Sequence, residues 1–187
     1  MLKGNPMKLL KNLAAALSAL LFVASGAFAD GDKPLSERDR LFLRAAAEHA
    51  YTAIAVADLT NRKSSNRDAR KIAKVIADDN RTALKSLKKL AADHNWTMPT
   101  GANAEQRRMI RSLGQTSGAA YTRMATRQYL RGYNELAPKY REMVEKGSDS
   151  HAREFAAKYL PAVQSHAQLV QNMAGKYRIP TTEAKAD

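Results

Sequence analysis

The chain has no cysteine among its 187 residues. Thiolate metal sites, cysteine nucleophiles and disulfides are therefore excluded, and stability must come from packing of the core. Glycine and proline are also scarce, with 9 and 6 residues, and few of them interrupt the long alanine- and leucine-rich segments. The sequence also lacks a glycine-rich phosphate loop, an HExxH motif and Ser-His-Asp spacing. Because these common catalytic motifs are absent, the sequence points to no particular reaction.

After residue 29 no apolar stretch is long enough to span a bilayer. The first 29 residues differ, because three lysines precede a short apolar run at 13–24. Small residues at Ala27 and Ala29 then suit a signal peptidase. We therefore expect residues 1–29 to be a signal peptide that is cleaved between Ala29 and Asp30. The product would be exported and periplasmic or associated with the outer membrane.

The exported part is strongly basic. It holds all 18 acidic residues and all but three of the 31 basic ones, the exceptions being Lys3, Lys8 and Lys11. Its net charge is thus about +10. No nucleic acid is expected as a partner outside the inner membrane. The anionic partners available there are lipopolysaccharide, anionic phospholipid and cell-wall polymer.

Apolar residues recur with the period of an amphipathic helix through most of residues 30–176. We expect an all-α domain, a ferritin-like four-helix bundle with one short extra helix in the connection between the second and third long helices. Up-down-up-down order and a ferritin-type crossover both fit that long connection. A flexible tail is expected at 177–187. The predicted helices cover about 36–61, 65–94, 104–113 (the short one), 117–146 and 149–176.

Three polar residues interrupt the apolar stripes near the midpoints of their helices. They are Asn80, Tyr133 and His166. Because helix midpoints share a level in a bundle, the three residues are expected to form one polar layer in the core, with Asn80 contacting the third or fourth long helix. The layer is either a hydrogen-bonded layer that fixes helix register or a metal site that uses His166 with Asp79. One imidazole is too few for a site, so no cofactor is predicted. The alternative metals are iron, manganese or zinc.

Four segments resemble a family of exported bacterial proteins with a ferritin-like fold, catalogued as domain of unknown function 4142. They are FLRAAAEHAYTAIAVADL, VIADDNRTALKSLKKLAADHNWTMPT, SGAAYTRMATRQYL and REFAAKYLPAVQSHAQL. The resemblance implies a metal layer of carboxylates and histidines. Alanines at 53 and 55 replace the family's glutamate, Asn80 replaces a histidine, and Gly132-Tyr133 replaces Asp-His. Only His166 is kept, which implies a degenerate metal site.

Rows of basic residues recur at turn spacing on the second and third long helices. Such rows are either a solvated face or a docking surface for anionic envelope components. We expect a non-catalytic interaction or stress-associated protein of the envelope. The alternative is a metal-binding redox or metal-storage protein that uses His166 with nearby carboxylates. The residues assigned to the anionic surface are Arg123, Arg127, Arg131, Lys74, Arg81 and Lys85.

The cleavage site gives a first prediction. Exported protein should begin at Asp30, because Ala27 and Ala29 occupy the positions that signal peptidase reads. Mass spectrometry of the intact exported protein measures this directly. A mass that still includes residues 13–24 would contradict both the cleavage site and the compartment.

Overall fold

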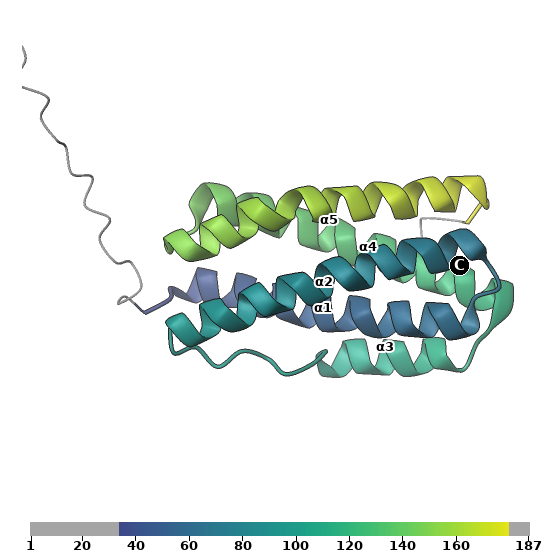
Figure 1. The fold of residues 1–187 in the computed structure, drawn as a ribbon, viewed down its shortest axis with the longest axis horizontal. Helices are drawn as coiled ribbons and strands as arrows, with labels where there is room; N and C mark the ends of the chain where they lie inside the picture. Colours follow the sequence, from purple (N-terminus) through teal and green to yellow (C-terminus); the bar gives the residue numbers. More distant parts are fainter. Residues whose placement is uncertain (1–33, 180–187) are drawn as a thin grey trace, which may run out of the picture.

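A computed structural model describes residues 34–179, and this part of the chain folds into five helices with no strand (Figure 1). The expected signal peptide, and residues 180–187 of the expected tail, lie outside the described residues. None of the described helices is both long and apolar enough to cross a membrane. The helices are α1 (Glu37–Lys63), α2 (Arg67–Asp93), α3 (Ala104–Gly114), α4 (Gly118–Lys146) and α5 (Ser150–Lys176).

Short polar side chains fix where the helices begin. At the start of α1, the Ser36 hydroxyl accepts a hydrogen bond from the backbone of Asp39. Asn103 and Asp149 cap α3 and α5 in the same way. The second long helix was predicted to begin at about residue 65, but Asn66 caps it, and its side chain accepts from the backbone of Ala69. Asparagine is at least as good a cap as serine, so the helix begins one residue later.

The four long helices pack side by side in antiparallel pairs, and their order follows from the contacts between them. The beginning of α4 meets the end of α1, where the hydroxyls of Tyr121 and Thr60 lie 3.0 Å apart. The end of α5 meets the beginning of α2, where Lys176 donates to Asp68. Helices α2 and α4 therefore run in the same direction, and the connection between them returns along the molecule through α3 (Figure 1). The connection from α2 to α4 is therefore a long crossover, and the helices do not follow the up-down-up-down order.

The core is built largely from small and aliphatic residues, and one end of it is aromatic. Phe42 of α1 packs edge-on against Tyr140 of α4, with ring centroids 4.9 Å apart. Phe155 and Tyr159 of α5 continue the cluster at 4.8 Å. Alanines predominate where α1 and α2 meet, which lets these two backbones approach closely.

A buried carboxylate joins the start of α1 to the turn between α4 and α5. Asp39 is fully buried. Its two oxygens accept backbone N–H groups from Ser148 at 3.0 Å and Asp149 at 3.2 Å, and the Ser36 hydroxyl at 2.6 Å. A buried charge is tolerated only when its acceptor sites are filled, as they are here. Asp39 therefore binds a distant turn as well as taking part in the cap at Ser36.

The first residues of the expected tail are held against the helices. Ile179 is buried, and its N–H donates to Ala174 at 2.8 Å. The Tyr177 hydroxyl donates to Asp68 at 2.8 Å. Ile179 thus packs back on the core, as an apolar residue just beyond a helix end can do.

Replacement of Asp39 tests the role of this carboxylate. Asp39→Ala should lower the free energy of unfolding by about 2–4 kcal/mol, because it strands two backbone donors in a buried turn. Urea denaturation gives the value. Glu37→Ala is the matched control, since Glu37 lies two residues away and makes only an exposed ion pair with Arg40. The control should cost less than about 1 kcal/mol, and equal losses in the two variants would contradict the assignment.

Candidate functional site

All three residues of the predicted polar layer are buried. Exposed fractions are 8% for Asn80, 1% for Tyr133 and 3% for His166. The rings of Tyr133 in α4 and His166 in α5 lie 5.4 Å apart, centroid to centroid. Tyr133 and His166 therefore lie at one level of the core, as the positions of the helix midpoints predicted.

The Asn80 side chain contacts the third long helix, as expected, because it lies beside the Tyr133 hydroxyl of α4. Its side-chain N–H donates to the carbonyl of Ile76 at 2.7 Å, which is one turn back in its own helix. A short amide in mid-helix reaches that carbonyl without any help from another helix. The Asn80 side chain lies near the Tyr133 hydroxyl, but no hydrogen bond of regular geometry joins them. Burial raises the pKa of Tyr133, and the nearby Asn80 amide opposes that rise.

His166 is paired with Asp79. The His166 Nε2 lies 2.8 Å from an Asp79 carboxylate oxygen, and that carboxylate is half exposed on α2. Burial lowers the pKa of His166, while the hydrogen bond to Asp79 raises it, and burial is the larger effect. The imidazole is therefore neutral near pH 7, with Nε2–H donating to Asp79. This donation uses the nitrogen that would otherwise bind a metal.

A fourth side chain, His49 of α1, belongs to the layer. Its ring meets Tyr133 edge-on, with the ring centroids 4.9 Å apart. Part of the residue faces a pocket, but the Nε2 atom is enclosed and has no hydrogen-bond partner. Burial lowers the pKa of His49 to about 4, and the charge of His166 adds to this effect. The sequence analysis did not place His49 in the layer.

Gly132 makes room for the His49 ring. A Cβ atom at this position would lie 3.2 Å from His49 Cε1 and 3.4 Å from Nδ1. Gly132 was the sequence signal that could have indicated this contact, because glycine is rare in a helix interior without a packing reason. Gly132 supplies no ligand to the layer, and the His49 imidazole of α1 occupies the space beside it.

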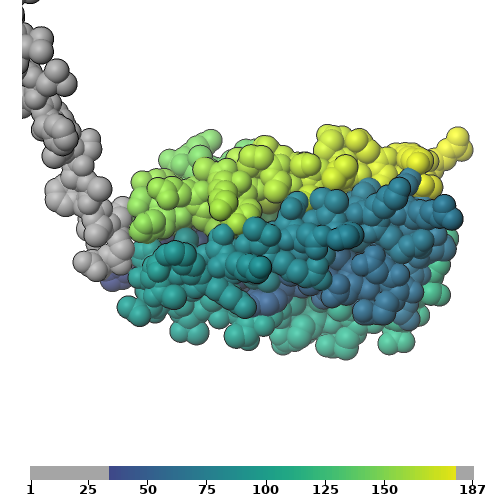
Figure 2. All heavy atoms as spheres, viewed as in Figure 1, coloured from purple at the N-terminus to yellow at the C-terminus, as the bar shows by residue number. Residues whose placement is uncertain are grey.

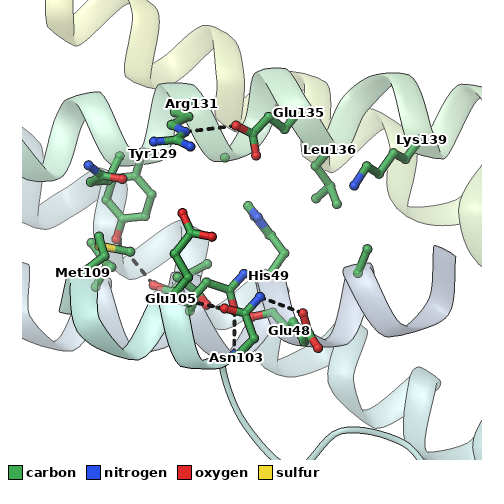
Figure 3. A pocket seen from close by; sticks show the side chains of 17 residues that line it. Glu48, His49, Asn103, Glu105, Met109, Tyr129, Arg131, Glu135, Leu136 and Lys139 are labelled. Carbon is green, nitrogen blue, oxygen red and sulfur yellow. Dashed lines mark hydrogen bonds and ion pairs between the residues drawn. The ribbon is translucent and has the colours of Figure 1, made fainter. Parts of the chain in front are cut away.

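Four side chains therefore form a row across the molecule, from His49 through Tyr133 and His166 to Asp79. At its His49 end lies a pocket of about 400 Å³ between α1, α3 and α4 (Figure 3). The mouth of the pocket is polar and carries both signs of charge, with Glu48 bound to Asn103 at 2.9 Å and Arg131 bound to Glu135 at 3.0 Å. Because no third donor converges on His166 and Asp79 in the described part of the chain, the row does not form a metal-binding set.

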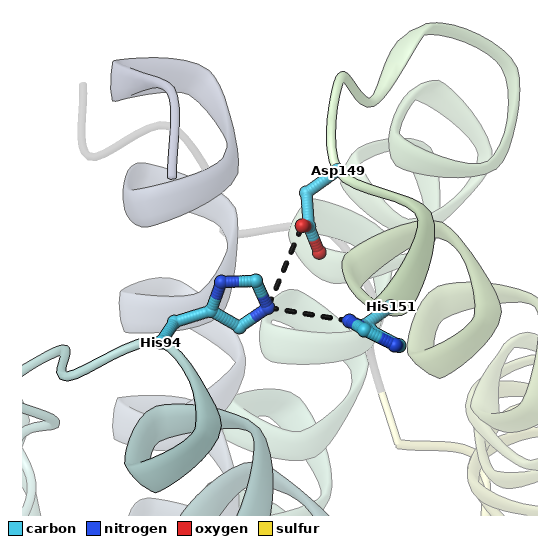
Figure 4. Close-up of side chains that lie close together, drawn as sticks. All are labelled: His94, Asp149 and His151. Carbon is cyan, nitrogen blue, oxygen red and sulfur yellow. Dashed lines mark hydrogen bonds and ion pairs between the residues drawn. The ribbon is translucent and has the colours of Figure 1, made fainter. Parts of the chain in front are cut away.

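A second cluster of side chains lies at the end of the molecule where α2 stops and α5 starts (Figure 4). His94 Nε2 is 3.4 Å from an Asp149 carboxylate oxygen and 3.4 Å from His151 Nδ1. Asp149 is buried, His151 is exposed, and the His94 side chain is enclosed. The helix bounds predicted from the sequence did not bring these residues together. His94 is separated from Asp149 and His151 by 55 and 57 residues along the chain, so only the topology of the helices brings it to them.

The basic rows are exposed but lie on different sides of the molecule. Helix α2 is at the front of Figure 2, and α4 lies behind it in the same view of Figure 1. Several of the charges are paired with acidic side chains: Lys74 and Arg81 contact Asp78, and Arg81 also contacts Asp58. The six residues assigned to one anionic surface thus divide into two rows, Arg123, Arg127 and Arg131 on α4, and Lys74, Arg81 and Lys85 on α2.

The comparison with known families agrees with the resemblance in the sequence. The sequence model of the domain of unknown function DUF4142 matches residues 25–173. The chain belongs to the DUF4142 family. No curated protein sequence matches it. Among solved structures it is similar to a DUF305 fragment from Deinococcus radiodurans, with 14% sequence identity, a TM-score of 0.67, and coverage of 77% of this chain and 99% of that one. This likeness shows the fold of the DUF4142 chain and leaves its chemistry to be argued from its own side chains.

Two buried tyrosines of α4 provide a matched test of the polar layer. The Tyr133 hydroxyl is buried without a partner, whereas the Tyr121 hydroxyl bonds to Thr60 and to the carbonyl of Val56. Tyr133→Phe should therefore raise the free energy of unfolding by about 1 kcal/mol, and Tyr121→Phe should lower it by a similar amount. Chemical denaturation measures both. A loss of stability in Tyr133→Phe would mean that its hydroxyl is hydrogen-bonded within the layer.

The two core histidines give a pH prediction. Their native pKa values are lowered, so the unfolded chain binds protons below about pH 6.5 that the native chain does not. Stability should fall as the pH decreases from 6.5 towards 4, by up to about 3 kcal/mol from His49. Urea denaturation at pH 7.5 and 4.5 should show a smaller loss in His49→Gln than in the wild type. Equal losses would contradict the burial of this ring.

Proposed function

We propose that the protein is an exported, ferritin-like four-helix bundle that acts in the cell envelope by binding, without catalysing a reaction. Export is supported by the character of residues 1–29, and the bundle by the crossover from α2 to α4 through α3. We infer a non-catalytic interaction or stress-associated protein. Its central layer is then the remnant of a metal site.

The observation that carries this proposal is the pairing of His166 with Asp79. In ferritin-like bundles, inward carboxylates and histidines of facing helices converge on a metal. Here the one imidazole that the family pattern keeps donates to a carboxylate at 2.8 Å, and the rest of the layer is an amide, a phenol and the enclosed imidazole of His49. These residues do not fit an iron or manganese centre, which needs several oxygen donors free to coordinate.

The partner that fits the surface best is an anionic envelope component such as lipopolysaccharide, anionic phospholipid or cell-wall polymer. The α4 row is the better candidate, because guanidinium groups bind phosphate and carboxylate with two hydrogen bonds. The neighbouring α3 carries three further exposed arginines, at 107, 108 and 111. Pairing with carboxylates does not separate the two rows, because Lys74 and Arg81 of α2 contact Asp78 and Arg131 of α4 contacts Glu135.

Binding to anionic phospholipid vesicles tests this proposal. Arg123, Arg127 and Arg131 should be replaced together by glutamine, and the matched control replaces Lys74, Arg81 and Lys85, so that both variants lose three charges. We expect weaker binding in the α4 variant, little change in the control, and a steep fall with salt as the screening length shortens to about 8 Å. Equal binding by both variants and the wild type would contradict a docking role for α4.

A second candidate function is favoured by the same 2.8 Å contact. A metal-binding redox or storage protein could use His166 with Asp79 if a second chain or a rearranged side chain supplied further donors. Iron, manganese and zinc are the metals to assay in purified protein. Metal that is lost in His166→Gln would support this candidate and contradict a degenerate core site.

A further inference from the structure

The His94, Asp149 and His151 side chains have the composition of a transition-metal site. Two imidazoles and one carboxylate are a common donor set for zinc and related divalent ions. One oxygen or nitrogen atom from each residue lies within 4.8 Å of those from the other two. Among the described residues no other group of histidine and acidic side chains converges in this way.

The distances in the cluster fit a shared ion better than they fit hydrogen bonds. Both contacts of His94 Nε2 are 3.4 Å, which is long for a hydrogen bond. Two ligands on a tetrahedral zinc ion, each about 2.0–2.2 Å from the metal, are about 3.3–3.5 Å apart. The exposed His151 is the side chain that can adjust, and it leaves the fourth position open to solvent.

Two of the three ligands, Asp149 and His94, are held by the fold before any ion arrives. Asp149 uses one oxygen to cap α5 through the N–H of Ala152 at 2.7 Å, and its other oxygen faces His94. Its backbone N–H is bound by Asp39. His94 ends α2 in a tight turn that Asn95 closes with φ of 49°, so the imidazole leaves the helix in a fixed direction.

The electrostatic setting also suits a cation. His94 lies at the carboxyl end of α2, where the helix dipole is negative and favours positive charge. Asp149 supplies one carboxylate within the cluster, whereas the nearby Asp93 is paired with Lys89 at 2.7 Å. With neutral imidazoles, the Asp149 carboxylate offsets half of the charge of a divalent ion.

We propose that His94, Asp149 and His151 bind one divalent transition-metal ion of the zinc type, with water in the fourth position. Bound there, the ion would join the end of α2 to the start of α5. This site is separate from the central layer and does not depend on the function proposed above.

Zinc titration of the purified protein, prepared without a histidine tag and stripped with a chelator, tests the site. We expect one zinc ion per chain by calorimetry, together with the visible absorption of tetrahedral cobalt when Co²⁺ is used instead. His151→Ala removes an exposed ligand with little risk to folding. Asp149→Asn keeps a side-chain oxygen to cap α5 and removes the charge. Each variant should bind at least about tenfold more weakly, since even the loss of an outer-shell partner costs 10–100-fold.

His166→Gln is the control, because it removes the core imidazole and leaves the cluster intact. It should bind zinc as the wild type does. Absence of stoichiometric binding, or unchanged binding in both His151→Ala and Asp149→Asn, would overturn the proposed site. Binding that is lost in His166→Gln alone would overturn it as well and would locate the metal in the core. Circular dichroism of every variant shows whether the helices are retained, and a folded variant with weakened binding supports the assignment.

Discussion

The arrangement of the helix ends depends on the buried carboxylate of Asp39. It fills its acceptor sites with two backbone N–H groups of the turn between α4 and α5, and so fixes that turn to the start of α1. Asp149, held in this way, caps α5 and turns its second oxygen towards His94 at the end of α2. One unfavourable burial, compensated by hydrogen bonds, thus positions three helix ends and the candidate metal ligands.

The middle of the molecule is built from ring contacts between polar side chains. The layer that would hold a metal in a ferritin-like protein here contains His49, Tyr133 and His166 in ring contact, and Asp79 closes the row at the surface. Two of these groups, the Tyr133 hydroxyl and His49 Nε2, have no hydrogen-bond partner. Such groups cost stability, so the layer is not an optimised hydrogen-bond network.

Helix periodicity and caps were enough to predict five helices near their observed bounds, and the midpoint argument brought Asn80, Tyr133 and His166 to one buried level. What the sequence could not supply was the relation between helices. His94 and His151 meet only because α2 and α5 are antiparallel, and the two basic rows separate because α2 and α4 do not pack as neighbours. His49 was not predicted to belong to the layer because it lies outside the apolar stripe of α1. Only Gly132, on α4, explains where its ring packs.

The central claim is that the side chains for metal binding now lie at the end of the molecule and no longer in its middle. Anomalous diffraction at the zinc absorption edge, from crystals of the protein grown with zinc, tests this claim most directly. The account predicts one strong peak among His94, Asp149 and His151, and none beside His166. A peak between His166 and Asp79, with no peak at the helix ends, would contradict it.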